Sequence, residues 1–156
     1  MSKDNPSNSP RFQIDRALVR SPAFRALKTP NAVRVLLDFH SKRRWVEKTN
    51  GRKRKKQWAF VNNGELEYTY KEAERRGMSS SVFVRALDEL IAHGFIDVVE
   101  TGAGVHKMKT LYSLSDRWQK WGTEEYVINK RPKKKRWREN RGFQRGHPYH
   151  PPKSRT

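Results

Sequence analysis

The fold is decided by residues 69–115, which read TYKEAERRGMSSSVFVRALDELIAHGFIDVVETGAGVHKMKTLYSLS. Thr69 followed three residues later by Glu72 has the spacing of a capping box, which predicts that a short helix begins here. Gly77 can adopt the backbone conformation that ends such a helix. The start of this stretch therefore predicts a short helix followed by a tight turn.

A longer amphipathic helix is predicted after the turn, over residues 80–93. Ser79 can cap its start, and Gly94 suits its end. At 3.6 residues per turn, one side of this helix is apolar and consists of Phe83, Ala86, Leu87, Leu90 and Ile91. The opposite side consists of Ser81, Arg85, Asp88 and Glu89, with Val84 beside them. We expect the apolar side to be buried and the polar side to face a partner.

Short strands are predicted on both sides of this helical pair. Residues 95–99 and 110–114 read as a hairpin whose connecting loop contains His106, Lys107 and Lys109. Upstream, residues 58–61 read as one strand and Leu66 to Tyr68 as another. Asn63-Gly64 between these two upstream strands is a strong signal for a tight turn.

The N-terminal part of the chain predicts two helices. Ser21-Pro22 and Thr29-Pro30 both place a capping hydroxyl before a proline, and the second helix is expected to run to about Arg44. A basic loop is expected over residues 42–57, where the chain leaves this helix. Near the other end, Ser115 is expected to cap a last helix whose tryptophans, Trp118 and Trp121, pack on the core. A homodimer contact through these tryptophans is the alternative.

The charge of the chain is concentrated in two segments. The formal net charge is +19 over 156 residues, with residues 42–56 contributing +8 and residues 129–156 contributing +10. The remaining residues are nearly neutral, as expected for a folded domain at 12–128. Residues 1–11 and 129–156 are proline-containing and polar, and we expect them to be disordered. A strongly basic protein of this kind usually binds a polyanion.

From Thr69 to Ser115 the chain resembles the bacterial winged helix-turn-helix domains, and the resemblance covers roughly residues 30–118. It looks especially similar to small plasmid and phage proteins, including the N-terminal domains of replication initiators and replisome organisers. The resemblance implies an α+β fold with a three-helix core and a small antiparallel hairpin, the wing. It also implies a non-enzymatic function in which the helix at 80–93 reads double-stranded DNA.

The predicted DNA contacts fall into four groups. The recognition helix offers hydroxyls for phosphates, Arg85 for guanine and Val84 for a thymine methyl group. The short helix before it and the wing offer basic side chains, and the two basic segments supply phosphate contacts. The predicted residues are Ser79, Ser80, Ser81, Val84 and Arg85; Lys71, Arg75 and Arg76; His106, Lys107 and Lys109; and Arg52, Lys53, Arg54, Lys55, Lys56, Lys133, Lys134, Lys135 and Arg136.

Other functional classes find little support in the sequence. The chain has no cysteine, no nucleotide-binding glycine motif and no catalytic constellation, so we expect no enzyme activity, no metal and no cofactor. No apolar run reaches the length of a membrane span, and a cytoplasmic, nucleoid-associated protein is expected. Transcriptional regulation is the preferred role. Replication or mobile-element accessory function is one alternative, and binding of RNA or single-stranded DNA through the tail is another.

Overall fold

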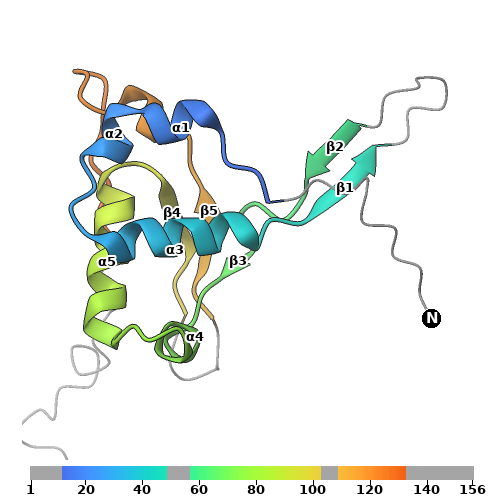
Figure 1. Ribbon diagram of the computed structural model, residues 1–156, viewed down its shortest axis with the longest axis vertical. Helices are drawn as coiled ribbons and strands as arrows, with labels where there is room; N and C mark the ends of the chain where they lie inside the picture. The colour runs from blue at the N-terminus through green and yellow to red at the C-terminus, as the bar shows by residue number, and fades with distance from the viewer. Residues whose placement is uncertain (1–11, 49–56, 103–108, 133–156) are drawn as a thin grey trace, which may run out of the picture.

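A computed structural model describes residues 12–48, 57–102 and 109–132, and it confirms the α+β class (Figure 1). The predicted disordered ends, residues 1–11 and most of 129–156, lie outside the described residues. In chain order the elements are α1 (Arg16–Arg20), α2 (Pro22–Arg25), α3 (Pro30–Ser41), β1 (Trp45–Lys48), β2 (Gln57–Phe60), β3 (Leu66–Glu67), α4 (Tyr70–Arg75), α5 (Ser80–Ala92), β4 (Ile96–Glu100), β5 (Leu111–Leu114) and the 3-10 helix η1 (Arg117–Lys120).

Four of the five predicted capping residues cap α-helices. Each side-chain hydroxyl accepts a hydrogen bond from a backbone amide in the first turn, at 3.1 Å for α2, 3.3 Å for α3, 3.2 Å for α4 and 3.4 Å for α5. The caps are Ser21, Thr29, Thr69 and Ser79. These bonds satisfy amides that have no partner inside the helix, so the starts of these helices follow from local sequence alone.

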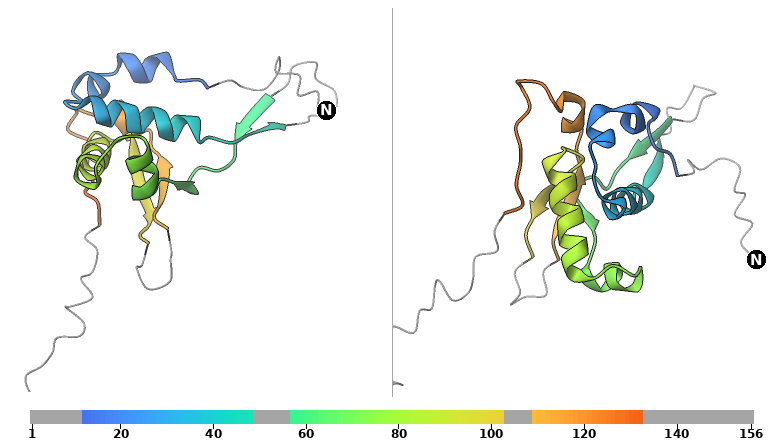
Figure 2. Two further views of the ribbon diagram at one scale, coloured as in Figure 1. Left: turned by 60° about the horizontal axis from the view of Figure 1, so that its bottom comes forward. Right: turned by 60° about the vertical axis from the view of Figure 1, so that its left-hand side comes forward.

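Two antiparallel sheets are present among the described residues. The larger has the strand order β3-β5-β4, with Leu66 opposite Tyr112 and Ile96 opposite Leu114. The smaller sheet consists of β1 paired with β2. The pairing begins with Trp45 opposite Phe60 and continues outward from the body. Figure 2 shows the β1–β2 ribbon projecting from the body, away from the end where α4 lies.

The core lies between α3, α5 and the three-stranded sheet. Helix α5 buries the predicted apolar side, and α3 buries Val35, Leu36 and Phe39 against it. An aromatic cluster connects these layers, with ring centroids 5.4 Å apart for Phe39 and Tyr68, 5.2 Å for Phe39 and Tyr112, and 4.7 Å for Tyr68 and Phe83. Because aromatic side chains bury large areas, this cluster fixes how the sheet packs on both helices.

The tryptophans after β5 pack against the body as expected. Trp118 is buried and stacks on Phe95 with centroids 6.3 Å apart. Trp121 is half-buried and stacks on His93 at 5.4 Å. Ser115 was predicted to cap this last helix, and its hydroxyl accepts from the Arg117 amide at 3.3 Å, at the first residue of η1. The residue directly before η1 is Asp116, whose side chain makes no capping bond. Both tryptophans therefore pack within the chain, as the preferred prediction has it.

The structure corrects the predicted path of residues 42–57. Helix α3 ends at Ser41 instead of Arg44, and the predicted basic loop contains strand β1 and the start of β2. The Asn62 side chain ends the helix by accepting from the Arg44 amide at 2.7 Å and donating to the Lys42 carbonyl at 3.0 Å. Beyond these bonds the chain is extended and forms β1, which pairs with β2.

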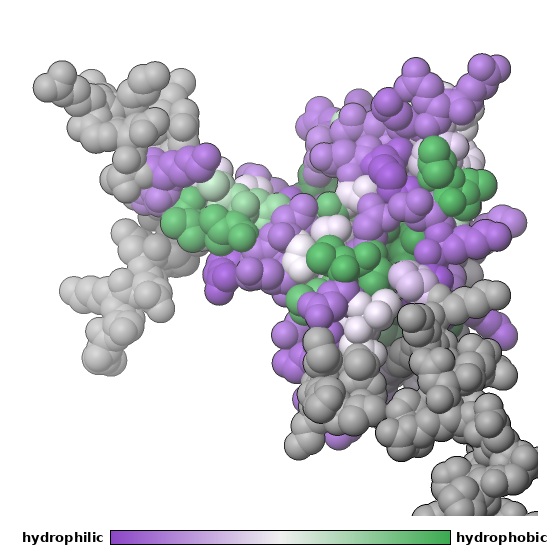
Figure 3. All heavy atoms as spheres, turned by 180° about the vertical axis from the view of Figure 1, so that it is seen from behind, coloured by the Kyte–Doolittle hydropathy of each residue, from purple (hydrophilic) through white to green (hydrophobic). Residues whose placement is uncertain are grey.

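Contacts at the base of the β1–β2 ribbon join it to the body. The guanidinium of Arg43 lies 5.0 Å from the Trp45 ring and 5.9 Å from the Phe60 ring, a favourable cation–π arrangement. Farther out, Val46 is exposed, and Figure 3 shows an apolar patch over the ribbon beside hydrophilic surface. Residues 49–56, which include the predicted contacts Arg52 to Lys56, lie outside the described residues.

One buried polar group makes the stability of the fold depend on pH. His40 on α3 is 7% exposed, and neither ring nitrogen has a hydrogen-bond partner among the described residues. Burial, with a smaller effect from the nearby Arg43, lowers the pKa of His40 from 6.5 to about 4. The folded protein therefore holds this imidazole neutral at pH values where the unfolded chain protonates it.

We expect the protein to lose stability as pH falls from 6.5 towards 4, by about 3 kcal/mol when the linkage is complete. The sign follows because the lowered pKa makes the unfolded state the one that binds the proton. The measurement is the free energy of unfolding in urea as a function of pH, for wild type and His40→Leu. His40→Leu should lose the part of the pH dependence that is due to His40. If its free energy of unfolding fell between pH 6.5 and 4 as much as that of the wild type, the assignment would be contradicted.

Candidate nucleic-acid interface

Helix α5 presents a polar side to the surface, as its sequence predicts. Ser81, Arg85 and Asp88 are exposed, and Val84 is half-buried beside them. Figures 1 and 2 place α4, the start of α5 and the ends of β4 and β5 that lead to their connecting loop at one end of the molecule. This end, together with the exposed side of α5, is the candidate interface.

The predicted placement of Glu89 on this polar side is wrong. Its carboxylate turns towards α3, where it accepts from the Thr29 hydroxyl at 2.6 Å and from the Lys28 amide. A carboxylate at the start of a helix is stabilised by the unpaired amides and by the helix dipole. Glu89 therefore connects α5 to α3 and leaves Asp88 as the exposed acid on the outer side of α5.

The serines at the start of α5 have different roles. Ser79 caps the helix, and its hydroxyl also lies 3.2 Å from that of Ser81. Ser80 and Ser81 are exposed within the first turn. The first turn of a helix has unpaired amides and a positive dipole end, so exposed hydroxyls here suit phosphate oxygens.

Basic side chains surround this end of α5. Arg85 on α5 and Lys71 and Arg75 on α4 are exposed, and none of the three forms an ion pair with another described residue. Their charges are therefore not offset by an acid within the described part of the fold. Lys71 and Arg75 belong to α4, and Arg85 lies one turn after Ser81 on α5. Figures 1 and 2 place α4 at the same end of the molecule as the start of α5.

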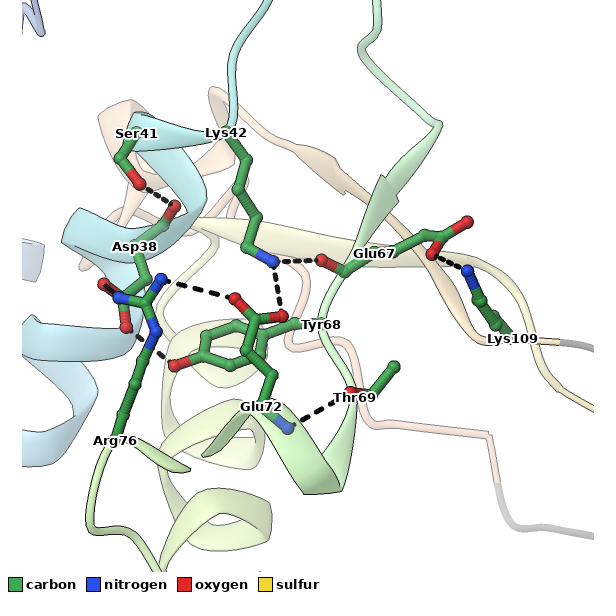
Figure 4. A network of polar contacts seen from close by, with 9 residues as sticks. All are labelled: Asp38, Ser41, Lys42, Glu67, Tyr68, Thr69, Glu72, Arg76 and Lys109. Atoms are coloured by element: carbon green, nitrogen blue, oxygen red, sulfur yellow. Dashed lines mark hydrogen bonds and ion pairs between the residues drawn. The ribbon is translucent and has the colours of Figure 1, made fainter. Parts of the chain in front are cut away.

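Arg76 belongs to a polar network that holds α4 against α3 (Figure 4). Its guanidinium pairs with Asp38 on α3 and with Glu72 at 3.3 Å. Asp38 also accepts from the Tyr68 hydroxyl at 2.6 Å, and Glu72 also pairs with Lys42 at 2.6 Å. Burial and the hydrogen bond to Asp38 raise the pKa of Tyr68 above its usual range. We assign Arg76 to positioning α4, whereas the sequence predicted a phosphate contact.

Lys109 is the only predicted residue of the loop at 101–109 that lies within the described residues. It forms an ion pair with Glu67 on β3 at 2.6 Å, and both side chains are about half exposed. The other predicted loop residues, His106 and Lys107, lie outside the described residues. The predicted tail contacts Lys133 to Arg136 also lie outside them.

Two arginines near this interface are not among the individual residues predicted from the sequence. Arg131 pairs with Asp88 at 3.2 Å, so the exposed acid on α5 has a cationic partner. Arg34 on α3 donates to the Arg76 carbonyl at 2.9 Å, at the end of α4. Both contacts join residues more than 40 positions apart, and no local pattern indicates them.

Comparisons with known proteins identify no relative. A scan of protein-family models and searches of curated proteins and of solved structures all found no match to this chain. Within the described residues, no helix has both the length and the apolar character needed to cross a membrane. The geometry of the interface therefore provides the evidence on function.

Proposed function

We propose that this chain is a non-enzymatic DNA-binding protein of the winged helix-turn-helix type. Helices α4 and α5, joined by a turn with Gly77 at a φ of 79°, are the helix-turn-helix pair. Strands β4 and β5 form the wing, and the ends of these strands that lead to their connecting loop lie at the same end of the molecule. Helix α5 is the recognition helix, and we assign it to the major groove of duplex DNA.

The observation that carries this proposal is the division of α5 into a buried side and an outer polar side. The outer side begins with exposed hydroxyls at the start of the helix, followed by Arg85 one turn later. Of the two acids in this part of α5, Glu89 turns inward to α3 and Asp88 is paired with Arg131. The remaining acid on the outer side is therefore neutralised. This side of α5 can then approach phosphates without repulsion from a free carboxylate.

The charge distribution supports the same partner. The chain carries a formal net charge of +19, and almost all of it is in the segments at 42–56 and 129–156. Each cation placed near a phosphate releases a counterion from DNA, so a folded reader with basic segments gains affinity without base contacts. We assign a regulatory role in transcription to this activity. The alternative is an accessory role in replication or in a mobile element, in which the same surface binds DNA at an origin.

The experiment is a salt titration of the binding of the full chain to a fluorescent 20-base-pair duplex. If six to ten phosphates are neutralised, log K should fall against log salt with a slope of about −5 to −9. Unlabelled single-stranded DNA and structured RNA serve as competitors, and duplex DNA should compete best. A slope near zero, or stronger competition by RNA, would contradict the proposal.

A further inference from the structure

The β1–β2 ribbon carries two tryptophans outside the core. Strands β1 and β2 pair with each other and not with the three-stranded sheet, and Figure 2 shows that they project from the body. Trp45 and Trp58 are half-buried and do not belong to the hydrophobic core, whereas Phe60 packs against the core from the base of the ribbon. Part of each indole ring therefore remains at the surface of an element that extends away from the fold.

The pairing register places these rings on one face of the ribbon. Trp45 lies opposite Phe60, and two residues farther out Glu47 lies opposite Trp58. Because successive side chains of a strand point to opposite faces, all four side chains share one face, which we call the aromatic face. The Trp45 and Phe60 ring centroids lie 5.9 Å apart, and Trp58 forms no ring contact with another described residue. The row of rings therefore ends, at its outer side, in an indole without a stacking partner among the described residues.

The charges beside the aromatic face suit a polyanion. Residues 42–48 contain four Lys or Arg and one acid. The Arg43 guanidinium lies 5.0 Å from the Trp45 ring, and neither Arg43 nor the exposed Lys48 forms an ion pair with another described residue. Two ribbons with this net positive charge repel each other, so the charge disfavours pairing with a second copy of the chain.

The one acid on the aromatic face indicates which part of a nucleic acid meets it. Glu47 lies opposite Trp58, and a carboxylate at this position repels phosphate. A carboxylate accepts hydrogen bonds from an exocyclic amino group of a base, such as that of cytosine. Aromatic side chains stack on the faces of bases, and these faces are open in a single strand but covered by neighbouring base pairs in a duplex. The aromatic face therefore suits unpaired bases, with the phosphates towards the flanking cations.

We propose that the aromatic face of the β1–β2 ribbon is a second nucleic-acid site, which stacks the unpaired bases of a single strand. It goes beyond the proposed function, because it does not involve α5 and takes a different form of nucleic acid. Trp45 and Trp58 are the stacking residues, and Arg43 is a positioning residue that holds the Trp45 ring by a cation–π contact. Stacking acts on the base, so single strands of DNA and RNA should bind alike.

The test compares single-stranded and duplex probes on variants of the full chain. Trp58→Leu removes the aromatic ring but keeps an apolar side chain in β2, and Trp58→Phe restores a ring. Val46→Thr is the matched control, because Val46 is exposed on the opposite face of the same ribbon. The probes are a fluorescent single strand of about 12 nucleotides, as DNA and as RNA, and the 20-base-pair duplex. Salt at about 0.3 M reduces the contribution of counterion release.

Trp58→Leu should weaken binding to both single strands by about five- to tenfold, whereas Trp58→Phe and Val46→Thr should stay within about twofold of the wild type. Binding to the duplex should change by less than about twofold in every variant, because its bases are already stacked. Circular dichroism and thermal denaturation establish that each variant is folded, as expected for side chains outside the core.

Equal losses on single strands and duplex, or an equal loss from Val46→Thr, would overturn the proposal. So would a wild type that does not bind single strands, or a dimer in sedimentation that Trp58→Leu dissociates, since the ribbon would then bind a second copy. Failure of the wild type to bind the duplex while it still binds single strands would instead overturn the proposed function.

Discussion

Gly94→Ala is expected to lower the free energy of unfolding by about 3 kcal/mol or more. Gly94 has a φ of 81°, which L residues rarely adopt, and a Cβ at this position would lie 2.7 Å from the Trp118 amide nitrogen and 2.9 Å from the Arg117 carbonyl carbon. The obstructing atoms are backbone, and the Trp118 amide also donates to the Gly94 carbonyl at 3.1 Å. They cannot move aside by changing a rotamer, so η1 and the end of α5 must separate.

Gly77→Ala is the matched control for this substitution. Gly77 has nearly the same conformation, with a φ of 79°, but a Cβ there would meet no atom within 4 Å. Its replacement should therefore cost only the conformational penalty, about 1–2 kcal/mol. Urea denaturation of both variants measures the difference. Equal losses would contradict the close approach of η1 to the end of α5.

The parts of the fold that the sequence predicts well are those with local signals. The caps Ser21, Thr29, Thr69 and Ser79 each act within three residues, and the glycines at 77 and 94 take the positive φ that ends a helix. The apolar side of α5 follows from helical periodicity, because one whole side packs against α3 and the sheet. Helices α4 and α5 and the strands at 96–100 and 111–114 can therefore be predicted from the sequence.

The parts that the sequence predicts poorly depend on distant partners. Strand β1 contains Glu47 and Lys48 and adjoins a basic run, so local composition indicates a loop. Its extended form follows from pairing with β2 and from the Arg43 contact with Trp45 and Phe60. Helix α1 was also not predicted, because it has five residues and buries only Leu18.

The candidate interface also combines features that follow from local sequence with features that depend on distant partners. The exposure of Ser81 and Arg85 follows from the helical wheel. The wheel places Glu89 on the same side, and only the approach of Thr29 and Lys28 from α3 turns it inward. Arg131 lies in a stretch whose proline and charge content indicates a tail, yet Asp88 fixes it in place. The positions of Glu89 and Arg131 are therefore both set by electrostatic contacts with residues far away in the sequence.

Arg85→Glu is expected to weaken binding to duplex DNA by about 100- to 1000-fold. The substitution removes a contact to a base or phosphate, worth about 1–3 kcal/mol, and places a carboxylate against the phosphates, which costs about 1–2 kcal/mol more at a solvent-exposed surface. Arg20→Glu is the matched control, since it changes the net charge equally. Arg20 is exposed on α1, which lies away from the α4 end, and it forms no ion pair with the described residues.

Comparing these two charge reversals on one 20-base-pair duplex at low ionic strength tests directly whether the outer side of α5 contacts DNA. We predict the large loss for Arg85→Glu and a loss of only a few-fold for Arg20→Glu, because a distant charge acts only through the screened long-range field. Equal losses from the two variants would contradict it, since α5 would then contribute nothing beyond its share of the net charge.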